Sequence, residues 1–108
     1  MEISVREKSD HKIIAIKGEV DLYSVGQLKK EIMSHIDDSV GSLAIDMTDL
    51  NHMDSSGIAL MAQLQKKMKA NDGTFCFLNI NQDVMNVLKL AALDKFFKIY
   101  TSEDELGA

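Results

Sequence analysis

Short apolar runs alternate along this chain with segments whose apolar residues have helical spacing. This alternation is the sequence feature that most constrains the fold. Residues 43–45 and 74–78 are apolar almost without interruption, which is typical of strands covered on both faces. In the segments that precede and separate them, apolar residues recur at steps of three and four, which predicts amphipathic helices. Strands joined through helices need crossover connections that pack those helices on the sheet. The chain is therefore expected to form an α/β fold.

The two ends of the chain complete this prediction. Residues 3–5 and 13–16 read as strands separated by a polar turn, which favours an antiparallel hairpin. The expected order is β-β-α-β-α-β-α-β-α in a single domain over residues 1–108. The predicted fold is a mixed, largely parallel sheet of four or five strands packed with about four helices. The last helix is expected to be short, with Ser102 and Glu105 forming a capping box. The apolar stripe predicted for the first helix is Leu22, Val25, Leu28, Ile32 and Ile36.

Composition excludes several classes of protein. The net charge of −5 argues against direct nucleic-acid binding, which normally requires a basic face. The single cysteine, Cys76, cannot form an internal disulfide and lies in an apolar run, so we expect a buried thiol and a reducing, cytoplasmic environment. No apolar stretch approaches the ~20 residues that span a bilayer. The N-terminus does not have the pattern of a signal peptide.

The sequence also lacks the usual signatures of catalysis and of metal or cofactor binding. His11, His35 and His52 show no metal-ligand spacing, and the acidic residues do not form a calcium loop. There is no G-x-S-x-G elbow, no phosphate-binding loop and no G-x-G-x-x-G motif. His52, Asp54 and Ser55 are close in sequence, but a catalytic triad requires convergence in space. We predict no catalytic residue, no metal site and no cofactor, with His52 in a loop at the solvent edge.

The stretch of greatest interest is Asp54-Ser55-Ser56-Gly57, which precedes the clearest helix pattern. In a structural interpretation, one of the first three residues caps the helix, and Gly57 allows a close approach of the helix start to its neighbours. In a regulatory interpretation, a spare serine hydroxyl accepts a phosphate, which adds about −1.5 to −2 charge. The positive end of the helix dipole would tolerate that charge, whereas a docked partner would be repelled. The two interpretations are compatible.

These residues belong to a pattern that resembles the STAS domain, and specifically the bacterial anti-sigma factor antagonists. The resemblance covers nearly the whole chain. Its matching segments are residues 18–22 (Gly-Glu-Val-Asp-Leu), 43–47, 53–58 (Met-Asp-Ser-Ser-Gly-Ile), 73–79, 87–88 and 93–100. The family differs in detail, since it often continues the motif as Gly-Leu-Gly where this chain has Gly57-Ile58-Ala59. It also commonly has a proline in the loop after Asp21, which this chain lacks, and a longer last helix.

The resemblance implies a function and assigns roles to residues. It implies binding to an anti-sigma factor that is also a serine kinase, which frees the sigma factor. The kinase then uses ATP to phosphorylate the serine after the motif aspartate, here Ser55, and a PP2C-type phosphatase reverses the modification. The implied partner-binding residues are Asp21, Asp54, Ser56 and Gly57. An alternative within the same fold is a scaffold or sensor STAS protein that assembles with other signalling proteins and is not controlled by an anti-sigma kinase.

Overall fold

An antiparallel hairpin opens the fold of the computed structural model, which describes residues 1–37 and 39–106. Strand β1 (Glu2–Lys8) pairs with β2 (His11–Val20), as predicted. Ser9 takes a positive φ of 53° in the tight turn between them. Such turns favour small polar residues, because short side chains tolerate the left-handed region best.

The remaining strands build a largely parallel sheet on this hairpin. β3 (Ser42–Asp46), β5 (Thr74–Leu78) and β6 (Lys98–Tyr100) follow β2 in the spatial order β1-β2-β3-β5-β6, each parallel to its neighbour from β2 onward. A further short strand, β4 (Leu50–Met53), pairs in parallel with the end of β2 beyond a register shift at Gly18/Glu19. The mixed, largely parallel α/β sheet is therefore confirmed, with β4 as an addition to the predicted order.

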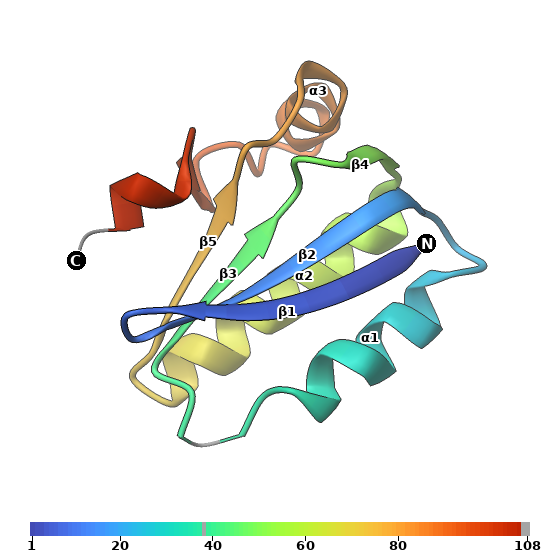
Figure 1. Cartoon of the computed structure of the whole chain (residues 1–108). Helices are drawn as coiled ribbons and strands as arrows, with labels where there is room; N and C mark the ends of the chain where they lie inside the picture. Colours follow the sequence, from blue (N-terminus) through green and yellow to red (C-terminus); the bar gives the residue numbers. More distant parts are fainter. Residues whose placement is uncertain (38, 107–108) are drawn as a thin grey trace.

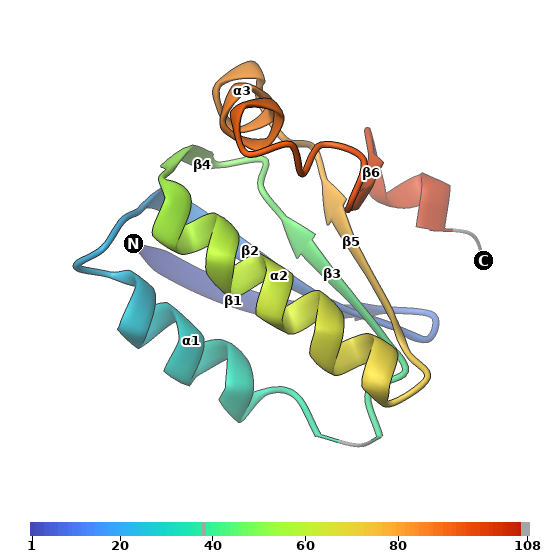
Figure 2. The same ribbon diagram turned by 180° about the vertical axis from the view of Figure 1, so that it is seen from behind.

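Helices α1 (Val25–Ser34) and α2 (Ser55–Ala70) cover the same face of the sheet, as Figure 2 shows from behind. α1 contributes Leu28 and Ile32 to the core, and α2 contributes Ile58, Met61 and Leu64. β3 lies between covered faces, and all five of its residues are buried, as its uninterrupted apolar run predicted.

The opposite face of the sheet carries a small second core that the C-terminal segment covers. The 3-10 helix η1 (Glu103–Leu106) brings Leu106 against buried residues that include Ile13 and Cys76. Cys76 is buried, as predicted. Its burial raises the pKa of the thiol to about 11, so the thiol is protonated at neutral pH. Arg6 donates to Asp46 at 2.9 Å and to Glu103 at 2.7 Å, which ties β1, β3 and η1 together.

Two local predictions were wrong. Leu22 was expected on the apolar stripe of the first helix, but it is 70% exposed, because residues 21–24 form a turn and α1 begins only at Val25. The capping box at Ser102 does not form, since the Glu105 carboxylate instead accepts from the Thr101 N–H and hydroxyl. The short last helix does form, as the 3-10 helix η1, so the described residues contain three α-helices and one 3-10 helix where about four helices were predicted.

Helix α3 (Gln82–Leu90) lies apart from the other two. It crosses the end of the molecule at which β3 and β5 terminate and packs beside β4 (Figure 1). Its Val84 and Leu88 side chains are fully buried. α3 and the start of α2 therefore border the carboxyl ends of the parallel strands, where α/β proteins commonly place functional residues.

Candidate functional site

The motif begins where β4 ends and α2 starts. The Asp54 N–H donates to the Val20 carbonyl at 3.1 Å, so the last residue before α2 is fixed to the end of β2. Asp54 itself has extended backbone geometry, with φ −87° and ψ −174°, as expected for a residue that caps a helix.

Asp54 is the cap, which resolves the three possibilities that the sequence left open. One carboxylate oxygen accepts from the N–H groups of Ser56 at 3.0 Å and Gly57 at 3.3 Å, and from the Ser56 hydroxyl. The other oxygen accepts from the Leu22 N–H at 3.1 Å, which joins the β2–α1 turn to the start of α2. The Ser56 hydroxyl, followed by the three N–H groups, holds the pKa of Asp54 below its usual range. The carboxylate is therefore charged at neutral pH.

The hydroxyl of Ser55 takes no part in capping the helix. It is the first residue of α2 and is exposed to solvent. Within the described ranges, no hydrogen bond engages its hydroxyl, whereas the hydroxyl of Ser56 is bound to Asp54. Of the two motif serines, Ser55 is thus the one whose oxygen is available to an incoming reactant.

Gly57 permits the close packing that holds this helix start in place. A Cβ at this position would lie 2.4 Å from Met53 Cγ and 3.0 Å from Val20 Cγ1, and both of those side chains are fully buried. The prediction that Gly57 allows a close approach is confirmed. Any larger side chain would push α2 away from the ends of β2 and β4.

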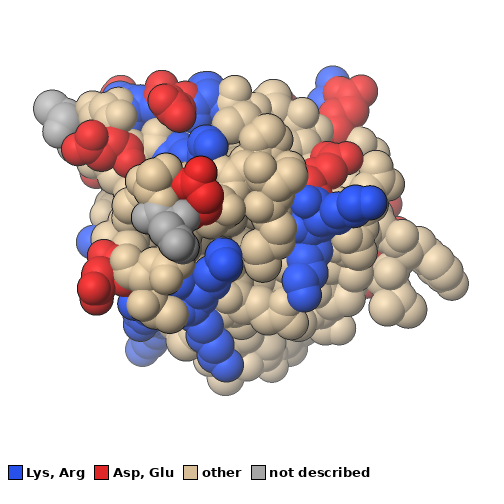
Figure 3. All heavy atoms as spheres, turned by 90° about the horizontal axis from the view of Figure 1, so that it is seen from below, with Lys and Arg blue, Asp and Glu red and all other residues tan. Residues whose placement is uncertain are grey.

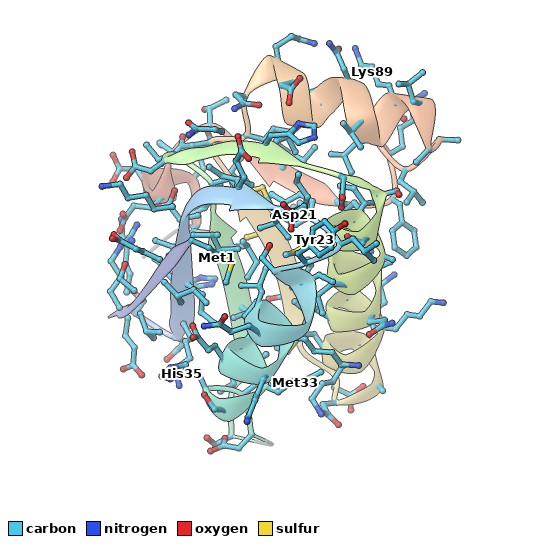
Figure 4. The ribbon with its side chains drawn as sticks, turned by 90° about the vertical axis from the view of Figure 1, so that its right-hand side faces the viewer. Met1, Asp21, Tyr23, Met33, His35 and Lys89 are labelled. Atoms are coloured by element: carbon cyan, nitrogen blue, oxygen red, sulfur yellow. The ribbon has the colours of Figure 1, made fainter. Side chains whose placement is uncertain are left out.

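Asp21 shapes the turn beside the motif. Its Oδ1 accepts from the N–H groups of Tyr23 at 2.9 Å and Ser24 at 3.0 Å, and from the Ser24 hydroxyl at 3.2 Å. This turn directs Leu22 and Tyr23 outward, with 70% and 94% of their surface exposed. Figure 4 shows Asp21 and Tyr23 near the start of α2, at the end of the molecule crossed by α3. The structure therefore brings the predicted residues Asp21, Asp54, Ser55, Ser56 and Gly57 together.

A shallow apolar groove continues from Ser55 toward α3, and sequence reasoning missed it. Ser55, Ile58 and Ala59 form one wall, and Val87 and Leu90 belong to the other. Leu90 is 89% exposed. No local pattern indicates this groove, because it forms only where the tertiary fold brings α3 beside the start of α2.

His52 also differs from its predicted place in a loop. It lies in β4, with a half-buried side chain whose Nδ1 is 2.5 Å from Asp83 Oδ2 in the first turn of α3. That hydrogen bond raises the pKa of His52 above its ordinary value, and the nearby carboxylates of Glu19 and Asp54 add to the effect. The partner is 31 residues away in sequence, so no local pattern could have indicated this pair.

Two other features are absent from the part of the chain that the structure describes. Residues 1–37 and 39–106 contain no group of three or more histidine, cysteine or acidic residues arranged to hold a metal ion. In the same ranges, no helix combines the length and apolar character needed to cross a bilayer.

Comparison with known proteins identifies the family. The STAS domain profile matches residues 2–106, and the chain belongs to the STAS domain family. A relative along the full chain is the anti-sigma-B factor antagonist of Listeria monocytogenes, which is 22% identical over 106 residues covering 97% of this chain and 93% of that protein. Distant full-length relatives of this protein are thus anti-sigma factor antagonists.

Solved structures share the fold. An anti-sigma factor antagonist from Mycobacterium paratuberculosis superposes with a TM-score of 0.85 at 23% identity, covering 96% of this chain and 88% of that one. The anti-sigma factor antagonist SpoIIAA in its unphosphorylated form gives a TM-score of 0.80 at 23% identity, covering 97% and 93% of the two chains. The phosphorylated form of SpoIIAA, the Bacillus cell fate determinant, gives 0.74 at 22% identity, covering 97% and 96%.

Proposed function

We propose that this protein is a cytoplasmic anti-sigma factor antagonist controlled by phosphorylation of Ser55. In its unphosphorylated form it binds an anti-sigma factor that is also a serine kinase, and so frees the sigma factor. The kinase transfers the terminal phosphoryl group of ATP to the Ser55 hydroxyl, and a PP2C-type phosphatase hydrolyses the phosphoserine. The protein contributes no catalytic residue or cofactor of its own, so it acts by binding.

The observation that carries this proposal is that Asp54 caps α2 while the hydroxyl of Ser55 stays exposed and unbonded. A helix start needs one cap, and Asp54 supplies it, which leaves the exposed Ser55 hydroxyl without a structural task. A phosphate at the first position of a helix meets the positive end of the helix dipole, so the fold tolerates it. A docked partner, in contrast, would have to accommodate a new dianion beside the Asp54 carboxylate.

The surface around Ser55 supports a protein partner. Leu22, Tyr23 and Leu90 are the most exposed of the large hydrophobic side chains, and they lie on elements that border the start of α2. Exposed apolar groups gathered at one place commonly mark a protein interface. In this arrangement, Asp21 and Asp54 act by shaping the Leu22–Tyr23 turn, and Ser56 and Gly57 by shaping the start of α2.

Direct binding to nucleic acid is not part of the proposal. Figure 3 shows the face at the end away from α3, where acidic and basic side chains are interspersed with uncharged ones. A nucleic-acid site would gather lysines and arginines into one patch. With a net charge of −5, the effect on transcription is proposed to pass through the protein partner.

The deciding experiment is phosphorylation by a purified anti-sigma kinase that binds the wild-type protein. With ATP, one phosphate should be added to wild type and to Ser56→Ala, and none to Ser55→Ala; mass spectrometry of the peptides locates it. Ser56→Ala is the matched control, because it removes a neighbouring hydroxyl. Phosphorylation confined to another residue would contradict the proposal.

A pull-down with wild type and Ser55→Asp tests the binding half of the cycle. The anti-sigma kinase, identified by mass spectrometry, should be captured by wild type and lost from Ser55→Asp. If both proteins capture the same partners and light scattering shows that both form large assemblies, the scaffold interpretation would replace the phosphorylation switch.

A further inference from the structure

Helix α3 is held in the core by the buried Val84 and Leu88, and its hydrogen bonds to β4 all lie at its first turn. Asn81, its cap, accepts from the Val84 N–H at 2.8 Å and donates to the carbonyls of Leu50 at 3.0 Å and Asn51 at 3.3 Å. The bond between His52 and Asp83 adds a second link from β4 to the same turn. β4 thus fixes the start of α3, while the last turn extends past Ser55.

The far half of α3 forms a wall of the apolar groove. Val87 and Leu90 face Ile58 and Ala59 across it, and Ser55 lies at its edge. A small turn of α3 about the line through the buried Val84 and Leu88 would change the width of this groove without disturbing the core or the Asp54 cap. Because Ser55 is itself part of the groove, a kinase that receives the Ser55 hydroxyl must cover the groove as well.

We propose that His52 and Asp83 form a pH-dependent latch that holds α3 against β4 and thereby sets the shape of the apolar groove beside Ser55. Its consequence for partner binding rests on the function proposed above, whereas the latch itself is a property of the free protein. The occupant of the groove is the apolar surface of the same anti-sigma kinase, since its access to Ser55 brings it over both walls.

The charges around His52 give the direction of the pH dependence. Asp83 faces it from α3, Glu19 from β2 and Asp54 from the start of α2, and all three favour the imidazolium. A group whose pKa is raised by folding stabilises the structure below its ordinary value, and that stabilisation is lost as the pH rises through the folded value. A neutral imidazole can still donate through Nδ1, but it loses the charge that strengthens the bond. The latch therefore loosens from about pH 6.5 upward.

Hydrogen exchange of the free protein tests the latch. Between pH 5.5 and 8.5, protection factors of the α3 amides should fall about two- to fivefold relative to those of α2, the range expected for an exposed ion pair. In His52→Gln and Asp83→Asn the α3 values should be lower and independent of pH. The double variant should match either single variant, because both remove the same interaction.

Two controls separate a latch from a general loss of stability. His35→Gln removes an exposed histidine beyond the far end of α1, distant from α3 in Figure 4, and should keep the wild-type pH profile. Glu19→Gln removes a carboxylate near His52 that is not bonded to it, so it should only shift the midpoint of the profile to lower pH. Loss of a purely structural contact would lower protection equally at every pH, and that result would overturn the proposal.

Methyl NMR then tests whether the latch reaches the groove. The methyl shifts of Ile58, Val87 and Leu90 should follow the titration of His52 in wild type and stay constant in His52→Gln. Equal pH profiles in the two proteins would overturn the link between latch and groove.

Binding of a kinase that is shown to phosphorylate Ser55 tests the consequence for the partner. The ratio of wild-type to His52→Gln affinity for this kinase should decline about two- to fivefold over the same pH range. If no anti-sigma kinase that binds the protein modifies Ser55, the proposed function fails, while the exchange test of the latch in the free protein stands.

Discussion

Asp54 connects two segments that are more than thirty residues apart by distributing the two oxygens of one carboxylate. One oxygen caps α2, and the other accepts from Leu22 in the turn that Asp21 organises. The sequence could not choose among Asp54, Ser55 and Ser56, because aspartate and serine are nearly equal as helix caps. The choice depends on Leu22, whose position beside α2 only the tertiary fold determines.

Removing this carboxylate should destabilise the protein. For Asp54→Ala we expect the free energy of unfolding to fall by about 1–2 kcal/mol, from the lost cap and the unpaired Leu22 N–H. Urea denaturation at pH 7 measures it. Asp49→Ala, which removes an exposed acid in the connector before β4, should change stability by less than about 0.5 kcal/mol.

The same variant should show a defined pH dependence. The folded-state pKa of Asp54 is lowered, so its stabilisation is complete above the ordinary carboxyl range and disappears as the pH falls through the folded value. The difference between wild type and Asp54→Ala should therefore shrink below about pH 4. A difference that stays constant from pH 7 to pH 3 would mean that the ionised carboxylate is not its source.

Two glycines in helices offer a matched test of packing at the motif. Gly57→Ala should cost about 1–3 kcal/mol, because its Cβ would overlap the buried Met53 side chain. Gly26→Ala in α1 meets nothing within 4 Å, so it should stabilise the protein by about 0.5 kcal/mol. Thermal and urea unfolding of both variants measure the contrast. Equal effects would show that the approach of α2 to β4 is not tight.

At the scale of elements, the sequence predicts those strands and helices whose apolar residues recur at a regular spacing or form a continuous run. The antiparallel hairpin, the buried strands β3 and β5 and the three helices follow from alternation, apolar runs and helical spacing. β4 was missed because its sequence, Leu-Asn-His-Met, has buried residues only at its two ends. It is a strand because β2 continues beyond a register shift and offers it a partner, which is a tertiary cause.

Gln65 shows how a polar residue within a helical pattern can join elements. Gln65 is only 5% exposed although it is polar, and its amide donates to the Phe96 carbonyl at 2.6 Å. Gln65→Leu keeps the volume but leaves that carbonyl without its donor, so we expect a loss of about 1–3 kcal/mol.

Urea denaturation measures this loss, and hydrogen exchange should show increased opening of the segment between α3 and β6. Gln63→Leu, an exposed position on the same helix, is the control and should stay within about 0.5 kcal/mol of wild type. If both variants lose the same stability, the bond to Phe96 is not what holds α2 to this segment.

At the scale of the whole molecule, the proposed switch requires that the stability of the fold change little when residue 55 becomes negatively charged. The side chain is exposed and packs into none of the cores, which lie behind α2 and beneath the C-terminal segment. An acid at the first position of a helix gains about 0.3–1 kcal/mol from the dipole, and repulsion from Asp54 opposes this gain. The two effects are of similar size, so their sum should be small.

Ser55→Asp should therefore unfold within about 0.5 kcal/mol of wild type in urea and keep the same far-ultraviolet circular dichroism, while it loses the anti-sigma kinase. Ser55→Ala is the control and should retain both stability and kinase binding. If Ser55→Asp lost more than about 2 kcal/mol, its failure to bind would follow from a damaged helix start. Full stability combined with lost binding would instead mean that charge at one exposed oxygen controls the partner surface while the sheet and its helices stay as they are.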